Sequence, residues 1–307
     1  MQLGFGLPVS GSWATPANVT RFATRAEELG YHSLWTFQRL LVPADPGARA
    51  SAPVYRSVLD PVTALGYAAA VTSRVRLGVA IWNLPFTAPV VIAKQLTTLD
   101  VLSDGRLDAG FGTGWSKEEF TAAGVPFERR GARADEFLRA LEAIWTQDVV
   151  AFSGDFYEIP PSRIEPKPVQ RPRPPILLGG AAEPALRRAG RAADGWISSS
   201  RADLASIGDS VGIIRAAAAE AGRDPERVRA VVRGAVQVRE AGDPGRRPLT
   251  GSIAEIKADL DTLAGQGVTE VFADLNFNPG IGNVEVDPAT ATARAEEILE
   301  ALAPAPA

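Results

Sequence analysis

The residues in this 307-residue chain that are best placed for chemistry are glycines, amides and aromatics next to predicted strand ends. Residues 103–124 (SDGRLDAGFGTGWSKEEFTAAG) predict a short buried strand that ends in Gly-Thr-Gly-Trp, and a helix follows at once. Ser116 is expected to cap this helix, and Glu119, three residues later, to complete a capping box. A strand that shrinks to glycines allows a flat ligand to lie against bare backbone, although a ligand-free turn has the same pattern.

A second glycine-rich turn predicts an anion-binding site. Gly179 and Gly180 end a predicted strand, and Pro184 begins a helix shortly after Ala181, so free backbone N–H groups and a helix N-terminus converge there. Such places bind anions, typically phosphate, and a simple tight turn is the alternative. If a phosphate binds here, a Gly180→Asp substitution should abolish binding and leave the fold intact, because the new carboxylate would occupy the phosphate position.

Several reaction classes are excluded by what the chain lacks. It contains no cysteine, so disulfides, thiolate catalysis and cysteine metal sites are ruled out, and no histidine cluster offers another metal site. The sole histidine, His32, precedes the second predicted strand and therefore lies at the wrong end for a Ser-His-Asp triad. A Schiff-base aldolase is not expected, because no lysine falls within a strand core: the four are Lys94, Lys117, Lys167 and Lys257.

Composition describes a globular protein with ample material for a core. Hydrophobic residues make up 46% of the chain, and a formal net charge of -4 argues against nucleic acid as the main partner. The apolar runs are broken by Gly, Pro or Arg well short of a spanning helix, so no membrane segment is expected. We expect a cytoplasmic protein, because a strand-like segment, QLGFGL, begins at residue 2 with no signal peptide before it.

The order of predicted elements indicates an α/β protein, a (β/α)8 TIM barrel that covers residues 1–307 as one domain. Eight apolar and mostly non-alternating segments are each followed by at least one helical segment, which is typical of strands covered on both faces. These segments are residues 2–7, 33–37, 75–83, 106–112, 176–180, 195–198, 228–238 and 268–275. A predicted hairpin (149–159) and a proline-rich segment (160–175) form an insertion between strands four and five. An open doubly wound sheet is the competing architecture.

In a barrel the working surface is formed by the carboxyl ends of the strands. Here these ends carry mostly apolar, aromatic and glycine residues and few titratable groups. Such a surface is poorly suited to hydrolysis and well suited to hold a cofactor that carries out the chemistry.

Several motifs together resemble one known superfamily. They include RLG at 76–78, GTGW at 112–115 with Glu119 and Phe120 after it, FSG at 152–154, and ADGW at 193–196. The chain resembles the bacterial-luciferase-like superfamily, and within it the flavin and deazaflavin oxidoreductases that use coenzyme F420.

The resemblance implies a TIM barrel with an insertion, usually a homodimer, and a flavin-type ring at the carboxyl ends of strands three and four. It also implies a non-prolyl cis peptide between Ala80 and Ile81, and a cofactor phosphate held after strand five. The cofactor-binding residues expected on this basis are Ala80, Ile81, Trp82, Asn83, Gly112, Thr113, Gly114, Trp115, Gly179, Gly180 and Ala181.

Two departures from the family pattern concern the reaction itself. Many relatives have Asp-His after strand two, where this chain has Gln38 and Arg39, and sugar-phosphate dehydrogenases of the superfamily have a Glu where Trp115 stands. Sugar-phosphate oxidation is therefore not expected, and Gln38 and Arg39 become the candidate catalytic residues, as donors to a substrate carbonyl or anion. Nearby tryptophans predict either an aromatic pocket or ordinary core packing: Trp13, Trp35, Trp82 and Trp115.

Three functions remain from the sequence. The first is an F420-dependent oxidoreductase that moves a hydride between the deazaflavin and a small organic substrate. The second is an FMN-dependent monooxygenase supplied with reduced flavin by a partner reductase. The third is a cofactor-binding barrel without catalysis.

Overall fold

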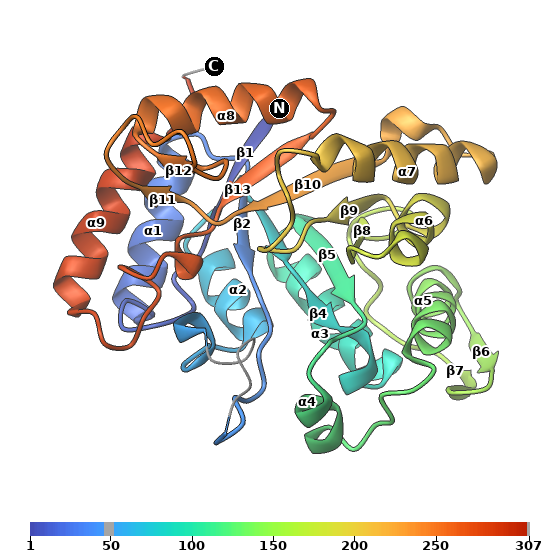
Figure 1. Ribbon diagram of the computed structural model, residues 1–307. Helices are drawn as coiled ribbons and strands as arrows, with labels where there is room; N and C mark the ends of the chain where they lie inside the picture. The colour runs from blue at the N-terminus through green and yellow to red at the C-terminus, as the bar shows by residue number, and fades with distance from the viewer. Residues whose placement is uncertain (46–51, 306–307) are drawn as a thin grey trace.

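The computed structural model describes residues 1–45 and 52–305. Within them, parallel strands form a closed eight-stranded barrel surrounded by helices (Figure 1). Direct pairing of β3 with β5 closes the ring, and β4 extends the third strand of the barrel along β5. The strands are β1 (Gln2–Gly6), β2 (Ser33–Thr36), β3 (Arg76–Val79), β4 (Trp82–Asn83), β5 (Leu107–Gly112), β8 (Ile176–Gly179), β9 (Gly195–Ile197), β10 (Arg229–Gly234) and β13 (Glu270–Ala273). The predicted TIM barrel is confirmed.

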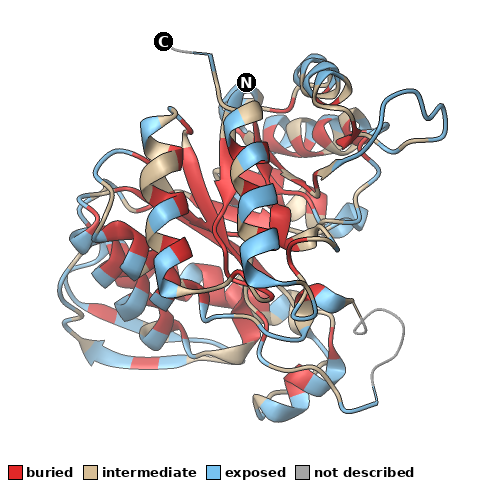
Figure 2. Cartoon of the chain, turned by 90° about the vertical axis from the view of Figure 1, so that its left-hand side faces the viewer, coloured by how far each residue is buried: buried red, intermediate tan, exposed pale blue. Residues whose placement is uncertain are grey.

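The helices begin where capping residues allow them to begin. Thr15, Asp60 and Asp287 each accept a hydrogen bond from a backbone N–H of the first turn, and a proline follows each of them. The helices bury their inner faces against the barrel and expose their outer faces (Figure 2). They are α1 (Pro16–Glu28), α2 (Pro61–Ala69), α3 (Pro89–Leu102), α4 (Lys117–Ala122), α5 (Arg130–Thr146), α6 (Glu183–Ala192), α7 (Ile207–Glu220), α8 (Ile253–Gly265) and α9 (Pro288–Ala301). In the described residues no helix is both long and apolar enough to cross a membrane.

The inside of the barrel is filled by aromatic rings that pack against glycines. Trp35 is 1% exposed and stacks on Phe272 with ring centroids 5.1 Å apart. A Cβ atom at Gly78 would lie 2.4 Å from the Trp35 ring, so a side chain there would displace the indole. The barrel is therefore a packed core, and ligands must bind at its ends.

The insertion between β5 and β8 lies where the sequence predicted it. It contains an antiparallel hairpin of β6 (Val150–Ser153) and β7 (Glu158–Ser162), followed by proline-rich chain with cis peptides at Glu165-Pro166 and Arg171-Pro172. The buried Asp100 carboxylate fastens this chain to α3, because it accepts hydrogen bonds from the backbone N–H groups of Val169 (2.7 Å) and Gln170 (3.1 Å).

Three segments differ from the sequence prediction. The predicted strand 75–83 is interrupted by a cis peptide between Ala80 and Ile81, which the family resemblance implied. The predicted strand 228–238 is wrong at its end: β10 stops at Gly234, and β11 (Gln237–Val238) pairs instead with β12 (Thr250–Gly251). The predicted loop 38–59 contains a short 3-10 helix, η1 (Pro53–Tyr55), and its residues 46–51 lie outside the described residues.

A charged network closes the amino end of the barrel. The Asp108 carboxylate is fully buried and accepts hydrogen bonds from Arg76 (2.7 and 3.0 Å) and Arg229 (2.9 and 3.0 Å). Arg229 also donates to Glu270 at 2.8 Å. Burial opposes ionisation of Asp108, but the two guanidinium groups outweigh it and hold its pKa below the usual range.

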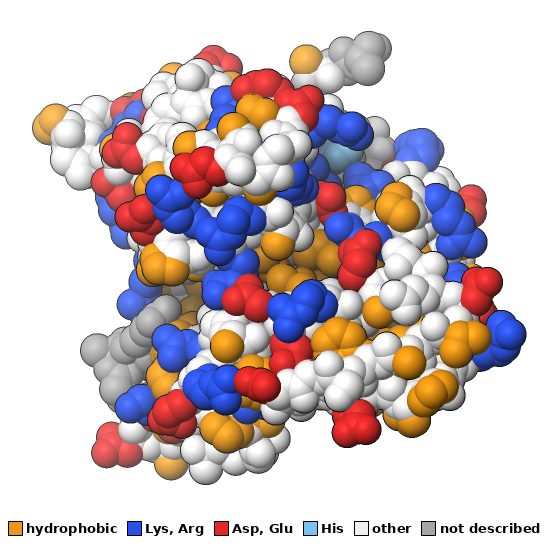
Figure 3. Space-filling model, turned by 90° about the vertical axis from the view of Figure 1, so that its right-hand side faces the viewer, with side chains coloured by type: hydrophobic (Ala, Val, Ile, Leu, Met, Phe, Trp, Pro, Cys, Tyr) orange, Lys and Arg blue, Asp and Glu red, His pale blue; other side chains and the backbone are white. Residues whose placement is uncertain are grey.

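Elsewhere the surface carries both signs of charge. Over the face that carries α5, α6 and α7, Lys and Arg side chains lie interspersed with Asp and Glu side chains (Figure 3). Opposite charges therefore neutralise one another locally on this side of the molecule.

Candidate active site

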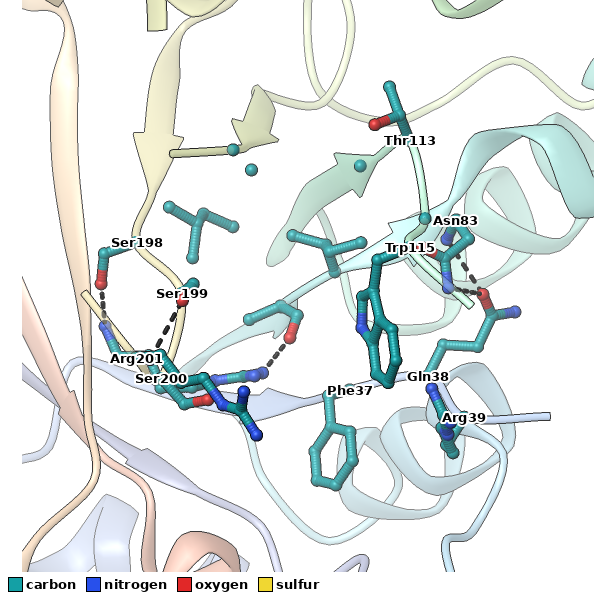
Figure 4. A pocket seen from close by; sticks show the side chains of 18 of the residues that line it. Phe37, Gln38, Arg39, Asn83, Thr113, Trp115, Ser198, Ser199, Ser200 and Arg201 are labelled. Atoms are coloured by element: carbon teal, nitrogen blue, oxygen red, sulfur yellow. Dashed lines mark hydrogen bonds between the residues drawn. The ribbon is translucent and has the colours of Figure 1, made fainter. Parts of the chain in front are cut away.

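A pocket of about 240 Å³ opens at the carboxyl end of the barrel. Its walls come from the ends of β2, β4, β5, β8, β9 and β10 and from the loops that follow them. Eleven of the thirteen predicted site residues line it: Gln38, Arg39, Ala80, Ile81, Asn83, Gly112, Thr113, Gly114, Trp115, Gly179 and Gly180. In Figure 4, Gln38, Arg39, Asn83 and Trp115 lie on one side of the pocket and residues 198–201 on the other.

The two remaining predicted residues do not line the pocket. Trp82 is 4% exposed and packs into the core, because successive side chains of an extended segment point to opposite faces and its neighbours Ile81 and Asn83 face the pocket. Ala181 is exposed beyond the glycine turn. Trp13 and Trp35 also belong to the core, so Trp115 is the member of the predicted tryptophan group that the described pocket contains.

One wall of the pocket is almost free of side chains. A Cβ atom at Gly112 would lie 2.4 Å from Ile81 Cδ1, and one at Gly179 would lie 3.0 Å from Ile81 Cγ2. The Ile81 side chain occupies the space that these glycines leave, and it lines the pocket together with the glycine backbone at the ends of β5 and β8. Such a surface suits the face of a planar ring.

Gln38 holds the third strand in place. Its Oε1 accepts hydrogen bonds from the backbone N–H of Asn83 (2.9 Å) and from Asn83 Nδ2 (3.1 Å). The predicted catalytic Gln38 therefore uses its carbonyl oxygen to position the loop after β4.

Arg39 is buried between two aromatic rings. Its guanidinium carbon lies 4.7 Å from the centroid of the Tyr55 ring and 4.6 Å from that of Trp115, and Nη1 lies 3.2 Å from Glu119 Oε2. The side chains of Arg39 and Glu119 are 3% and 2% exposed. Nε and Nη2 of Arg39 are buried and have no hydrogen-bond acceptor among the described residues. The pair is neutral overall and still offers two donors.

The capping box predicted at α4 is only half formed. Ser116 accepts a hydrogen bond from the Glu119 N–H at 3.5 Å, as expected of a cap. The Glu119 carboxylate, however, accepts from the backbone N–H of Leu40 at 2.7 Å and pairs with Arg39. The Glu119 side chain therefore bonds to the loop after β2 instead of the backbone N–H of Ser116, and it links α4 to that loop.

The opposite side of the pocket is rich in hydroxyl groups. Ser199 Oγ accepts from the backbone N–H of Arg201 at 3.0 Å, and Ser198 Oγ accepts from that of Arg233 at 3.0 Å. The exposed Arg201 guanidinium makes no ion pair or hydrogen bond with any residue of the described chain. Trp196 donates to the Gly180 carbonyl at 2.8 Å, which holds the glycine turn beside these serines.

A second arginine forms the floor of the pocket. Arg233 donates to the Ala80 carbonyl, and its Nε lies 3.3 Å from the carboxylate of Asp274, which is 1% exposed. Burial lowers the pKa of Arg233 and raises that of Asp274. Tyr55, Arg201 and Arg233 also line the pocket and were not predicted from the sequence. The available signal for Arg201 was a cation directly after the serines at 198–200, at a strand end.

The glycine turn also corrects one expectation. Gly180 has a φ of 151°, and a Cβ atom there would lie 2.5 Å from Ala185 Cβ. A Gly180→Asp substitution would therefore strain the turn and the start of α6 whatever charge it brought. The expectation that this substitution leaves the fold intact is wrong.

Comparison with known proteins places this barrel in a family. The model of the luciferase-like monooxygenase family matches residues 4–269. The chain belongs to the luciferase-like monooxygenase family. Its members are oxidoreductases, some dependent on FMN and others on F420.

Relatives of both kinds are similar to this luciferase-like protein. The FMNH(2)-dependent dimethylsulfone monooxygenase of Pseudomonas putida is 36% identical over 217 residues, which is 70% of this chain and 58% of the relative. The F420-dependent glucose-6-phosphate dehydrogenase of Amycolatopsis mediterranei is 33% identical over 206 residues, which is 65% of this chain and 58% of the relative. Among solved structures, the monooxygenase RslO1 of Streptomyces bottropensis superposes with a TM-score of 0.79 at 25% identity and covers 98% of both chains.

Proposed function

We propose that this luciferase-like protein is a coenzyme F420-dependent oxidoreductase that acts on a small, neutral organic substrate. The observation that carries the proposal is the division of one pocket into a glycine wall and two polar ends. One end holds buried donors without an acceptor among the described residues, and the other holds hydroxyl groups and a guanidinium without a partner among them. The glycine wall suits the cofactor ring, the donor end suits the substrate, and the hydroxyl end suits the cofactor phosphate.

The residues present fit such a cofactor. Ile81 fills the space beside Gly112 and Gly179, because a Cβ atom at either glycine would crowd its side chain, and the apolar surface of these three residues is suited to the face of a planar ring. Backbone N–H groups near Gly180, the serine hydroxyls and the guanidinium of Arg201 are suited to a phosphate. When bound, F420 supplies a carbon that accepts or donates a hydride.

The shape of the phosphate end favours F420 over FMN. FMN ends at its phosphate, whereas F420 continues beyond it. The pocket does not close at Arg201, because a second cleft begins at the same residues, Ser200, Arg201 and Arg233. A cofactor that continues past its phosphate would use this space.

The Arg39 end favours a neutral substrate with a hydrogen-bond acceptor. Nε and Nη2 lie on the same edge of a guanidinium group and donate in parallel. Glu119 already balances the charge of Arg39, so an anion bound there would add an unbalanced charge to a buried site. A carbonyl or other neutral oxygen acceptor would satisfy the two donors without that penalty.

The experiment that tests the proposal is a parallel titration of the purified protein with F420 and with FMN, followed by fluorescence. We expect tight binding of F420 and weak binding of FMN, and Arg201→Ala should weaken F420 binding about tenfold, as expected for loss of a charge-assisted phosphate contact. Tight FMN binding with weak F420 binding would contradict the proposal.

The alternative is an FMN-dependent monooxygenase. The dimethylsulfone monooxygenase and RslO1, both described as monooxygenases, favour it. Reduced FMN reacts readily with oxygen, whereas the reduced deazaflavin hardly does. Substrate-dependent oxygen consumption by the protein with reduced FMN would support this alternative, and hydride transfer without oxygen uptake would support F420.

A further inference from the structure

A cleft of about 300 Å³ adjoins the candidate active site on its hydroxyl-rich side. It shares Ser200, Arg201 and Arg233 with the active-site pocket and extends from there to Arg247 and Thr250. The two cavities therefore meet at Arg201, where the proposed function places the cofactor phosphate. We call this second cavity the tail cleft.

Two arginines of the tail cleft have no partner among the described residues. Neither the Arg201 nor the Arg247 guanidinium makes an ion pair or hydrogen bond with the residues that the structure describes. The acid in the cleft, Asp203, already accepts from Ala205 N and Ser206 Oγ, both at 3.0 Å. Arg233 is paired with Asp274. The cleft is thus locally positive in a chain whose net charge is -4.

The neighbouring Arg246 differs from Arg247 in this respect. Arg246 forms a two-pronged ion pair with Asp259, with distances of 2.6 and 2.9 Å, so one arginine of the adjacent pair is fully engaged. The Arg247 carbonyl accepts from the Thr250 backbone N–H at 3.1 Å and from its hydroxyl at 2.6 Å. The backbone at Arg247 is therefore held in place, while its guanidinium has no partner among the residues that the structure describes.

We propose that the tail cleft binds the carboxylates of an anionic tail that extends from the cofactor phosphate, with Arg247 as a principal contact. The inference rests on the proposed function, since F420 carries an oligoglutamate tail beyond its phosphate. Carboxylates match the donor fork of arginine. Because Arg201 and Arg247 are exposed, the attraction weakens as salt screens it.

The test compares two forms of F420, one with several glutamates and one that ends at the lactyl group, on the wild type, Arg247→Ala and Arg227→Ala. Arg227 is a matched control, because it is exposed and lies just before β10, at the amino end of the barrel. Dissociation constants come from F420 fluorescence at low and at high salt.

We expect Arg247→Ala to weaken binding of the glutamate-bearing form about two- to fivefold at low salt, the size expected for an exposed ion pair. Its affinity for the shorter form should stay the same, and Arg227→Ala should change neither. Equal affinities of the wild type and Arg247→Ala for the glutamate-bearing form would overturn the inference, as would an equal loss for both forms. A wild type that binds FMN and neither F420 form would overturn the proposed function and the inference with it.

Discussion

At the amino end of the barrel, Arg76 and Arg229 saturate both oxygens of the buried Asp108, whereas at the carboxyl end Arg39 keeps two buried N–H groups without an acceptor in the described structure. Both ends place guanidinium groups against carboxylates inside the same fold. They differ in whether the network is complete. An unsatisfied buried donor costs about 1–3 kcal/mol, so the carboxyl end is the less stable arrangement in the absence of a ligand.

This difference separates a structural network from a binding site. Asp108 accepts hydrogen bonds from Arg76 and Arg229, which have further acceptors of their own, and the network links strands β3, β5 and β10. Arg39 lies between Tyr55 and Trp115, and one edge of its guanidinium group has no acceptor among the described residues. Donors kept in place and unpaired are preorganised for an incoming acceptor.

The largest effect is expected at the saturated end. Asp108→Ala leaves Arg76 and Arg229 facing each other without their shared carboxylate, and we expect a loss of about 3–5 kcal/mol in the free energy of unfolding. Urea denaturation measures it. The pair of the exposed Arg21 and the half-buried Glu296 is the control, because Arg21→Ala should cost less than about 1 kcal/mol. A similar small cost for Asp108→Ala would show that the amino-end network does not hold the barrel.

The buried carboxylates at the two ends, Asp108 and Asp274, should change the stability of the protein with pH in opposite directions. The pKa of Asp108 is lowered by folding, so its contribution to stability is present above about pH 4 and is lost as the pH falls through the lowered value. Burial raises the pKa of Asp274, so stability from that group falls as the pH rises from about 4 through the raised value. Urea midpoints between acidic and neutral pH, for Asp108→Asn and Asp274→Asn, test this. The urea midpoint of the wild type should exceed that of Asp108→Asn by more as the pH rises, and should exceed that of Asp274→Asn by less. If both differences change with pH in the same direction, the two ends do not differ in this way.

The next largest effect concerns the Arg39 pair. In the double variant Arg39→Met with Glu119→Gln, no buried charge is left alone and the Leu40 N–H keeps an acceptor, so the free energy of unfolding should be unchanged or higher. kcat/KM should nevertheless fall at least about tenfold, because a substrate oxygen would lose charged donors worth about 1.5–3 kcal/mol each. The single variant Arg39→Met, which leaves Glu119 unpaired, should be clearly destabilised. Retention of kcat/KM by the double variant would show that the pair is structural, like its counterpart at the amino end.

The sequence predicted the barrel because each strand is an apolar run with a helix after it. This pattern is local and does not depend on contacts between distant residues. It also predicted most of the pocket, since residues at the carboxyl ends of parallel strands must converge. It could not predict Arg233, whose place in the pocket depends on Asp274 from another strand, or Tyr55, which lies in a long loop. The prediction of a capping box was wrong for the same reason, because the partners of the Glu119 side chain lie about 80 residues away along the chain.

The smallest expected effect distinguishes a positioning residue from the donors of Arg39. Gln38 accepts two hydrogen bonds from Asn83 and so holds the loop after β4 against the pocket. Gln38→Leu removes the acceptor, and we expect kcat/KM to fall about tenfold, in keeping with about 1–1.5 kcal/mol for the hydrogen bonds lost. Gln38→Glu keeps a side-chain oxygen for Asn83 and should restore most of the activity. If Gln38→Glu is as inactive as Gln38→Leu, the amide of Gln38 itself contacts the substrate, and the unsatisfied edge of Arg39 is not the only donor that the reaction uses.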